Sequence, residues 1–516
     1  MAYPSLADFL EELASLGQLS RVAAQVALDG ELAAVTARVA RSGGPALVFE
    51  RVGEQPRSVV TNLLGTADRV ARAVGVESPE QLEDHGQAWY APREEEGWFS
   101  ALWRGTPSAG RQAVRAVRSA GCQQIVHLGR DVALETWPLA RSWPEEPRAS
   151  LVAQVLTADA VAGVRHLGRS VLEVLDERHL AWHISPHEAA FRDWQVSRAR
   201  CEPLPIVAWL GGDPAGVVAA ASGHVPAQQE VDGLAWLAHL RRAAVDVVAC
   251  RTTPLEVPAD AEVVIEGVVH PVSTSGADSL AAPPGPSAAA ETHQRDAALR
   301  AVQRGPESPL PATALVGPLG YYRRRPAAAV VEVTAITHRS NPLVPLTITG
   351  PPPHEDSHLQ AAAMRLSLPA LRRVLPQLVA IEVPSFAGAR LVAFTSIRKR
   401  QPLEGRRVAG AIWSMWPWAS IKWLVVVDDD VDPTDPLAVW ARVAAVADPA
   451  RDFIVQTVPA DPWDPTSADG VAAPAVAIDA TFKLAGEREE PTPARAVPQA
   501  AIDELLASRW SEYGLG

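Results

Sequence analysis

The distribution of apolar and polar positions divides the chain into three blocks of regular elements and a tail. In the first block, residues 1–115, apolar residues recur at helical spacing in three segments and form short continuous runs in two others. The helices are expected at 5–18, 31–41 and 68–74, and the buried strands at 45–50 and 58–62. Helices that alternate with buried strands predict an α/β domain.

The second block, residues 116–326, is richer in strands. Its expected strands are 124–127, 205–210 and 263–269, and its expected helix is 234–242. Residues 271–313 interrupt the block with a stretch dominated by Ala, Pro, Gly and Ser. This composition predicts a solvated insertion, because it offers little apolar surface to bury and is too long for an ordinary connection.

The third block, residues 327–485, alternates strands and helices again. Its expected strands are 330–333, 346–350, 378–381, 390–394 and 423–427; its expected helices are 359–366 and a second one from Pro369 to Leu375. Three acids, Asp428 to Asp430, end the last strand, where we expect a turn and a helix cap rather than a metal site. In the tail, residues 486–516, an apolar stripe predicts a helix that packs on a partner or on the core.

Composition narrows the class of protein. A chain of 516 residues fits two to four domains, and its net charge of −13 argues against nucleic acid or an anionic membrane as a partner. The three cysteines are too few and too far apart for a disulfide framework or a cysteine-based zinc site. We find no run of about 18 apolar residues and no basic amino-terminal region, so we expect a cytoplasmic protein.

Short segments identify the chain more specifically than its periodicity does. They are PALVFE (45–50), NLLGT (62–66), LEVPADAEVVIEG (255–267), TITG (347–350), VVVDDDVDP (425–433) and DPARD (448–452). In wording, order and spacing they resemble the UbiD family of prenylated-flavin-dependent decarboxylases. The resemblance covers about residues 5–485, apart from the insertion.

The resemblance implies a mixed α/β fold in three parts, with a central flavin-binding domain of split β-barrel type between α/β domains. It also implies homo-oligomers built on dimers. The reaction that it implies is the non-oxidative decarboxylation of an aromatic or α,β-unsaturated carboxylic acid. The implied cofactors are prenylated FMN, which stores the electrons released on decarboxylation, and Mn²⁺ and K⁺, which clamp the flavin phosphate.

Three residues occupy positions of the family's binding site. Arg169 matches the arginine that holds the substrate carboxylate by paired, charge-assisted hydrogen bonds, with Arg165 as a rival. His187 matches the metal-binding histidine beside the flavin phosphate. Trp416 replaces the basic residue that often contacts this phosphate; it can stack on an aromatic ring but cannot neutralise the phosphate charge, and Lys422 lies six positions further on.

The remaining metal positions depart from the family pattern. Val164 stands in place of an asparagine and has no donor atom for a cation. Gly233 stands in place of a glutamate, although a slip of one residue would supply Asp232, and Glu230 is close in sequence. We therefore assign His187 and Asp232 as candidate metal ligands, while the replaced positions argue against Mn²⁺ and K⁺.

The acid pair of the family is replaced as well. Val316, in place of the first acid, cannot carry a proton. Tyr321, in place of the second, can transfer one, but its ordinary pKa of about 10 makes it a poor partner for an arginine. Arg169 and Tyr321 are therefore the catalytic candidates. Other groups that could supply the proton lie in the insertion: Asp278, Glu291 and His293.

Two functions compete. The first is a divergent decarboxylase of the UbiD type, in which Arg169 orients the substrate. The second is a repurposed or non-catalytic homologue, with a different reaction or as the partner subunit of an active paralogue, because several positions of one site are replaced together. The charge pattern gives no support to a nucleic-acid-binding or membrane-binding role.

Overall fold

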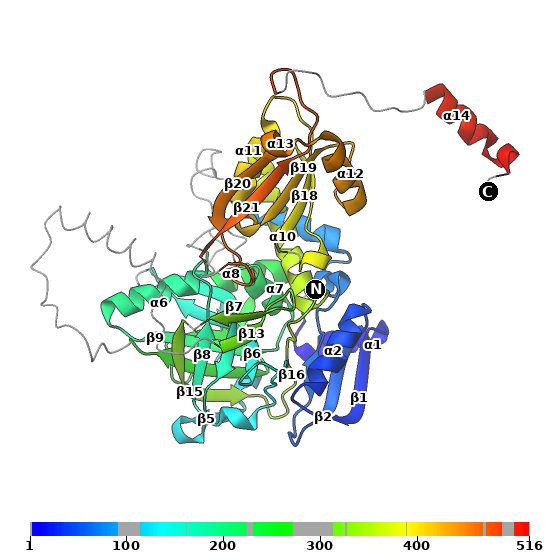
Figure 1. Cartoon of the computed structure of the whole chain (residues 1–516). Helices are drawn as coiled ribbons and strands as arrows, with labels where there is room; N and C mark the ends of the chain where they lie inside the picture. The colour runs from blue at the N-terminus through cyan, green and yellow to red at the C-terminus, as the bar shows by residue number, and fades with distance from the viewer. Residues whose placement is uncertain are drawn as a thin grey trace, which may run out of the picture.

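The computed structural model describes residues 3–90, 114–160, 162–223, 231–271, 313–325, 328–388, 390–467, 471–487 and 500–514. Figure 1 shows an amino-terminal α/β part, a central β-rich part and a carboxyl-terminal α/β part. The insertion lies almost wholly outside the described residues, and four residues weighed as site candidates lie outside them too: Glu230, Asp278, Glu291 and His293.

The amino-terminal part is a small sheet with helices packed on it. The strand order is β1-β2-β3-β16, where β2 and β3 are antiparallel and the other neighbours are parallel. The strands are β1 (Leu19–Val26), β2 (Ala46–Val52), β3 (Val59–Thr61) and β16 (Val344–Pro345); the helices are α1 (Leu6–Ser15), α2 (Glu31–Arg41), α3 (Ala67–Ala73) and α4 (Leu82–Tyr90). The elements expected in this block are confirmed, with small differences at their ends.

The central part is a closed barrel of six antiparallel strands. They follow the order β12-β9-β6-β7-β8-β15, and β15 pairs back with β12. The strands are β6 (Ser150–Ala158), β7 (Arg165–Val174), β8 (His179–His183), β9 (Leu204–Leu210), β12 (Val263–Val269) and β15 (Ala329–His338), and β5 (Ile125–Leu128) extends the sheet beyond β15. Alternate residues of β9 belong to different cores: Ile206 and Ala208 to one, Val207 and Trp209 to the other.

Helices and smaller sheets surround the barrel. The helices are α6 (Ala189–Arg200), α7 (Ala215–Ala221) and α8 (Gly233–Arg241). A sheet of order β11-β10-β4 contains β11 (Glu256–Pro258), β10 (Val245–Ala249) and β4 (Val114–Ala116), and β13 (Thr313–Val316) and β14 (Tyr322–Arg325) form a hairpin. The mixed α/β class with a central barrel is therefore confirmed.

The carboxyl-terminal part is a five-stranded sheet between helices. Its order is β17-β18-β19-β21-β20, with β17 (Leu378–Glu382), β18 (Val392–Ile397), β19 (Trp423–Asp428), β20 (Phe453–Pro459) and β21 (Ala472–Asp479). Leu424 and Val426 pack toward α11 (Glu404–Trp413), while Val425 and Val427 pack toward α12 (Pro436–Val446). Burial on both faces explains why β19 is a continuous apolar run. The short α13 (Pro449–Asp452) precedes β20.

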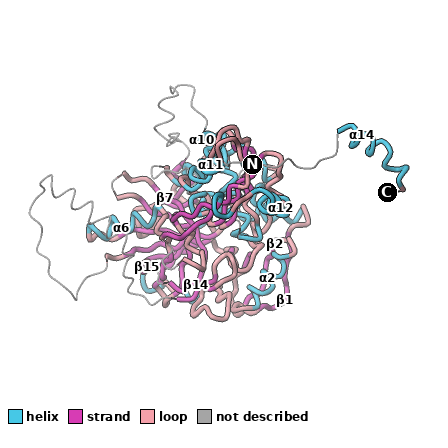
Figure 2. The backbone as a smooth tube through the Cα atoms, turned by 45° about the horizontal axis from the view of Figure 1, so that its top comes forward, coloured by secondary structure: helices cyan, strands magenta, loops and turns pink. Residues whose placement is uncertain are grey.

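The long helix α10 (Glu355–Val374) connects the parts of the molecule. It packs against α3, α4 and α7, and it lies between the barrel and the carboxyl-terminal sheet (Figures 1 and 2). We expected a new helix to begin at Pro369, but this was wrong: Pro369 lies inside one continuous helix. Packing on three other helices stabilises α10 through the proline, whose missing N–H removes one hydrogen bond.

Three other expectations need correction. Residues 329–338, expected to begin the third block at 327, form the strand that closes the barrel. Residues 346–350 do not form a strand, because only Val344 and Pro345 pair with β3. Asp428 and Asp430 bind Arg442, and the cap of α12 is Asp435 instead. The expected turn at Asp428 to Asp430 is thus confirmed, but these acids hold neighbouring side chains rather than cap a helix.

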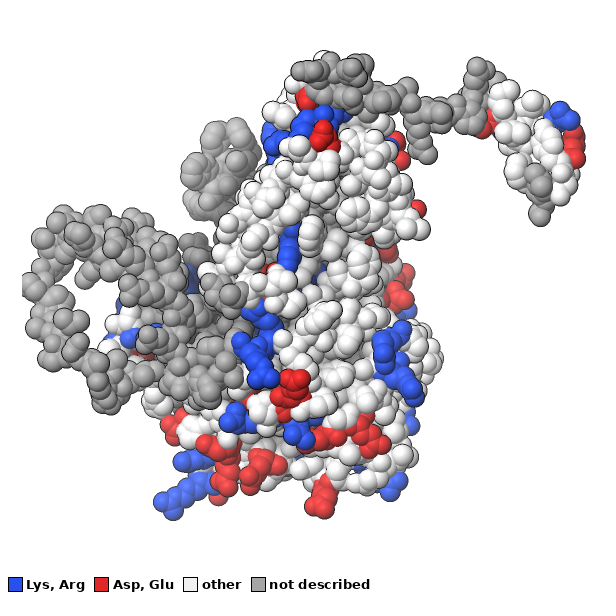
Figure 3. All heavy atoms as spheres, viewed as in Figure 1, with Lys and Arg blue, Asp and Glu red and all other residues white. Residues whose placement is uncertain are grey.

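The tail helix is α14 (Ala500–Arg509), and it projects away from the three parts (Figures 1 and 2). Its apolar residues Ile502 and Leu505 are each 45% exposed, so it does not pack on the core of the described chain. On the face drawn in Figure 3, basic and acidic side chains lie interspersed over the lower half. Within the described ranges, every helix is too short or too polar to cross a membrane.

Candidate active site

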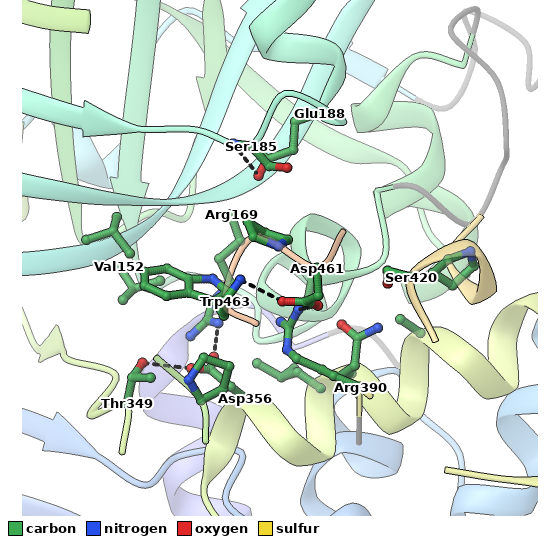
Figure 4. Close-up of a pocket in the computed structure, with 18 of the residues that line it drawn as sticks. Val152, Arg169, Ser185, Glu188, Thr349, Asp356, Arg390, Ser420, Asp461 and Trp463 are labelled. Carbon is green, nitrogen blue, oxygen red and sulfur yellow. Dashed lines mark hydrogen bonds and ion pairs between the residues drawn. The ribbon is translucent and has the colours of Figure 1, made fainter. Parts of the chain in front are cut away.

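A cavity of about 130 Å³ lies where the barrel, the start of α10 and the carboxyl-terminal part meet. Strand β7 contributes Arg169, helix α10 contributes Asp356, and loops of the carboxyl-terminal part contribute Arg390, Trp416 and Asp461 (Figure 4). The wall therefore combines side chains from segments more than 200 residues apart. It contains cations, carboxylates and aromatic rings together.

Arg169 is held in this cavity by two neighbours. Its Nη1 donates to Oδ1 of Asp356, and its Nη2 donates to the hydroxyl of Thr347 at 2.7 Å. Thr349 donates to the other Asp356 oxygen, Oδ2, at 2.7 Å. Only 13% of the Arg169 side chain and 9% of the Asp356 side chain are exposed. A guanidinium fixed by a carboxylate and a hydroxyl is preorganised for a further anion.

The first turn of α10 fixes Asp356 from the other side. His354 is the amino-terminal cap of the helix: its Nδ1 accepts from the Asp356 N–H at 3.3 Å, and its Nε2 donates to the Pro318 carbonyl at 2.9 Å. Burial alone would raise the pKa of Asp356, but the Arg169 charge and the bonds from Arg169 and Thr349 hold it well below its usual range. Asp356 is therefore an ionised partner of Arg169.

The neighbouring Glu355 joins this turn to the amino-terminal part. Its Oε1 accepts from the Leu64 N–H at 2.8 Å, and burial raises the pKa of this carboxyl. Arg69, which lies close by, donates to the carbonyls of Leu63, Asn62 and Gly44. The NLLGT and TITG segments are thus both bonded to the first turn of α10, through Leu64 to Glu355 and through Thr349 to Asp356.

A second arginine of the cavity, Arg390, lies in the turn before β18. Its Nη1 donates to Oδ2 of Asp461 at 2.9 Å, and Oδ1 of Asp461 accepts from the Trp463 N–H at 2.8 Å. The side chain of Arg390 is 21% exposed, and that of Asp461 is 5% exposed. Figure 4 shows the Asp461 carboxylate beside the Arg390 guanidinium. The cavity therefore contains two Arg–Asp pairs.

A polar network that includes a cavity residue lies under the barrel wall. His183 lines the cavity, and its Nε2 lies 3.2 Å from Oε2 of Glu173. Glu173 also accepts from Arg148 and Thr313, each at 3.1 Å. Burial raises the pKa of Glu173, but the hydrogen bonds from His183 and Arg148 lower it by more than burial raises it. The pKa of Glu173 therefore lies below its usual value. Glu173 is therefore a counter-charge for Arg148 and a hydrogen-bond partner of His183.

Tyr321 and Val316, which stand where the family has its acids, are placed differently from each other. Tyr321 is 64% exposed and is not among the residues that line the cavity. Val316 lines it, and its N–H donates at 3.3 Å to Glu146, a buried carboxyl whose pKa burial raises. Three carboxylates line the cavity itself: Glu188, Asp356 and Asp461.

The two candidate metal ligands are bonded to other groups. His187 Nε2 lies 3.0 Å from the Val471 carbonyl, an arrangement in which this nitrogen carries a proton. Asp232 caps α8 by accepting from the N–H groups of Leu234 and Ala235, each at 3.0 Å, and its Oδ2 accepts from Arg165 at 2.7 Å. In the described part of the chain, no three His, Cys, Asp or Glu side chains come together as a metal site.

The two replaced metal positions do not supply ligands for the metal of the family: Gly233 has no room for a larger side chain, and the Val164 side chain has no donor atom. A Cβ atom at Gly233 would lie 2.3 Å from the Leu167 Cβ and 2.8 Å from the Leu167 N, so no glutamate fits there without a shift of α8 from β7. The carbonyl of Val164 accepts from Asp159 N–H in the turn before β7. The replaced positions therefore serve packing and turn formation.

Trp416 lines the cavity, and its ring centroid lies 5.3 Å from that of His187. Lys422 does not compensate for the missing base, because its Nζ binds Asp464 at 3.1 Å and also Thr466. Arg165, the rival of Arg169, is bound by Asp232 and by Glu256 at 2.8 Å and does not line the cavity. Of the two arginines, only Arg169 faces a ligand-sized space.

Of the two Arg–Asp pairs that line the cavity, the sequence singled out Arg169 but not Asp356, Arg390 or Asp461. Arg390 was assigned to the start of a strand, and Asp461 falls outside every segment that carries the resemblance. One available signal was the HED triplet at 354–356, a charged group that follows three prolines and begins a helix. Another was the DPWDP segment at 461–465. Neither segment indicates which arginine Asp356 or Asp461 would bind.

Comparison with protein-family models matches three consecutive domains of 3-octaprenyl-4-hydroxybenzoate carboxy-lyase (UbiD). The amino-terminal domain matches residues 10–89, the Rift-related domain residues 115–352, and the carboxyl-terminal domain residues 357–480. Together they cover most of the chain.

Solved structures of the class share the fold. The chain is 24% identical to the UbiD-class enzyme HmfF from Pelotomaculum thermopropionicum, solved in complex with FMN, with a TM-score of 0.71 over 98% of this chain and 100% of that one. It is 22% identical to the vanillic acid decarboxylase of Sedimentibacter hydroxybenzoicus, with full coverage of both chains. The TM-score is 0.79 for the closed form of that enzyme and 0.71 for its open form.

The three matched domains follow one another in order, and the six-stranded barrel at the centre agrees with the fold that these solved structures share. The protein therefore belongs to the UbiD family of carboxy-lyases.

Proposed function

We propose that the protein is a non-oxidative decarboxylase that removes the carboxyl group of an aromatic or α,β-unsaturated acid with prenylated FMN. The observation that carries this proposal is Arg169, which is fixed by Asp356 and Thr347 at a cavity between the barrel and the carboxyl-terminal part. This is the residue that the family resemblance assigns to the substrate carboxylate.

The geometry of Arg169 suits this role. A guanidinium has five N–H donors, and Asp356 and Thr347 each engage one of its terminal nitrogens. The remaining donors can bind a substrate carboxylate. Because Asp356 is ionised, it orients Arg169 and cannot itself donate a proton to the reacting carbon.

The residues that line the cavity fit a flavin in part. Trp416 and Trp463 offer flat aromatic surfaces, and Arg169 and Arg390 offer positive charge. When bound, prenylated FMN supplies a ring system that accepts the electrons released with carbon dioxide. The metal of the family does not fit, because His187 and Asp232 are bonded within the chain, and we assign it no role.

A proton must reach the carbon that loses carbon dioxide. Of the carboxylates that line the cavity, Asp356 is held ionised by Arg169 and Asp461 is paired with Arg390, which leaves Glu188 as the donor near the ligand. Tyr321, the residue predicted from the sequence, could take part only if the exposed turn that carries it moved toward the cavity. Glu188→Gln and Tyr321→Phe variants would separate these two groups.

The test is reconstitution. The protein would be co-expressed with a flavin-prenylating enzyme, its visible absorption recorded, and carbon dioxide release measured from a panel of hydroxybenzoic, cinnamic and heteroaromatic acids. We expect a bound prenylated flavin and release from at least one acid. Failure to bind the flavin, together with no release from any acid, would reject the proposal.

The second candidate is a repurposed or non-catalytic homologue. It is favoured by the packing of Gly233 against Leu167 and by the apolar Val316 in place of an acid, since both changes remove groups of the parent reaction. Flavin binding without decarboxylation of any acid in the panel would support this candidate.

A further inference from the structure

Arg390 has more hydrogen-bonding capacity than its protein partner uses. Within the described chain, its side chain makes a hydrogen bond through Nη1 only, to Asp461 at 2.9 Å. Its Nε is buried and has no hydrogen-bond partner there. An arginine that is mostly buried and bonded through a single nitrogen is incompletely satisfied, and the cost of such a state favours binding of a further acceptor.

Asp461 orients Arg390 rather than saturating it. One Asp461 oxygen accepts from Arg390, and the other accepts from the Trp463 N–H at 2.8 Å. The carboxylate is therefore fixed by its own turn and offers the arginine one oxygen only. This leaves the rest of the guanidinium at the edge of the cavity that it lines (Figure 4).

The other residues that could bind a second anion are either bound to protein groups or uncharged. Lys422 is bound by Asp464 and Thr466, and Trp416 stands where the family resemblance predicts a base. Arg169 is bound by both Asp356 and Thr347 and is assigned to the carboxyl group that is lost. A ligand with a second anionic group would therefore meet Arg390.

We propose that Arg390 forms a second anion-binding position in the cavity, oriented by Asp461, which takes a carboxylate or phosphate group other than the carboxylate at Arg169. The inference rests on the proposed function for the assignment of Arg169. The anionic oxygens could belong to a second carboxylate on the substrate or to the phosphate of the flavin, and Arg390 would bind either by charge-assisted hydrogen bonds.

The test measures binding to the full chain without turnover. Two pairs of probes differ by one anionic group: benzoate against terephthalate, and riboflavin against FMN. Dissociation constants would be measured by calorimetry for the acids and by flavin fluorescence for the flavins. The proteins are wild type, Arg390→Met, Arg390→Lys, and Arg398→Met as a control, since Arg398 is 63% exposed at the end of β18 and binds Asp429.

We expect Arg390→Met to weaken binding of either terephthalate or FMN, the probe of each pair with the additional anionic group. The loss should be about tenfold to a hundredfold, the range for a lost charge-assisted hydrogen bond. Binding of the other probe of that pair, benzoate or riboflavin, should stay within about threefold of wild type, which is under 1 kcal/mol. Arg390→Lys should recover part of the loss, and Arg398→Met should behave as wild type. A loss for terephthalate identifies a second substrate carboxylate, and a loss for FMN identifies the flavin phosphate.

Two results would overturn the inference. One is an unchanged ratio within both pairs of probes in Arg390→Met; the other is a wild-type protein that binds none of the four probes. These results differ from failure of the proposed function. A reconstituted protein that releases no carbon dioxide, yet loses its FMN or terephthalate preference in Arg390→Met, would reject the reaction and retain the anion position.

Discussion

The guanidinium of Arg169 on β7 donates to the carboxylate of Asp356 in the first turn of α10, and both side chains are nearly buried. This contact joins the barrel to the helix that packs against the other parts of the molecule. It also places an internal carboxylate beside the arginine that the family uses for a substrate. The pair thus links the stability of the fold to the proposed chemistry.

We predict strong coupling between these two residues. The free energy of unfolding would be measured for Arg169→Met, Asp356→Asn and the double variant. Each single change should cost about 3–5 kcal/mol, because it leaves a buried charge without its partner, whereas the double variant should cost clearly less than the sum.

The exposed pair Arg398–Asp429 provides the control for this cycle, since the two side chains are 63% and 39% exposed. Its coupling energy should be about 1 kcal/mol or less. Additive costs for Arg169 and Asp356, similar to those of the control pair, would show that their contact does not stabilise the folded state.

His354 should make stability depend on pH. Burial lowers the pKa of His354 below its ordinary value of about 6.5, so the folded protein binds fewer protons there than the unfolded chain. Stability should therefore rise with pH up to about 6.5 and become flat above it. Protonation would place a hydrogen on Nδ1, where it would face the Asp356 N–H from which this nitrogen accepts in the neutral form.

The measurement is the unfolding midpoint of wild type and His354→Gln between pH 5 and 8. The difference between the two proteins should shrink or reverse toward pH 5, where wild type bears the cost of protonating His354. The control is His270→Gln, because the His270 side chain is 62% exposed and its pair with Glu332 lies at the surface; this variant should track wild type closely at each pH. A difference between wild type and His354→Gln that stays constant over this range would contradict the prediction.

Gly233 should tolerate no side chain. Gly233→Ala would place a Cβ atom 2.8 Å from the backbone N of Leu167, which requires α8 to shift from β7. Overpacking of this kind should lower the free energy of unfolding by about 1–3 kcal/mol. The matched control is Gly410→Ala inside α11, where nothing lies within 4 Å; it should stabilise by about 0.5–1 kcal/mol. Equal effects of the two changes would refute the packing argument.

Flavin binding should not require a divalent metal. His187 Nε2 donates to the Val471 carbonyl, Asp232 caps α8 and binds Arg165, and the described residues contain no group of three His, Cys, Asp or Glu side chains that could hold a cation. We expect the dissociation constant for FMN to stay the same in EDTA and in excess Mn²⁺. A tightening of tenfold or more with Mn²⁺ would show instead that these side chains rearrange to bind metal.

Much of the fold could be predicted from the sequence because periodicity reflects burial. The helix expected at 31–41 is α2, with the same bounds, and the apolar run at 423–427 is β19. The segments that carry the family resemblance also have structural roles. Glu266, for example, accepts from the N–H groups of Arg251 and Thr252 and fixes the turn before β11.

The site was less predictable, because its contacts join distant segments. The pattern LTITG at 346–350 indicated a strand, since Leu346 and Ile348 are buried and alternate with threonines. The segment has this alternation without a partner strand, and Thr347 and Thr349 turn to Arg169 and Asp356 instead. An alternating pattern shows which residues of an extended segment are buried on one side. It does not show which distant residues the side chains on the other side contact.

The central claim is that Arg169 holds the carboxylate that is lost, and isotope exchange tests it most directly. Protein loaded with prenylated FMN would be incubated with an acid of the panel and ¹³C-bicarbonate, and incorporation of ¹³C into the carboxyl group followed by mass spectrometry. We predict exchange by wild type and a loss of at least about a hundredfold in Arg169→Met, with flavin content unchanged, because a bidentate charged contact to the reacting group is removed. Exchange by Arg169→Met at the wild-type rate would contradict the claim.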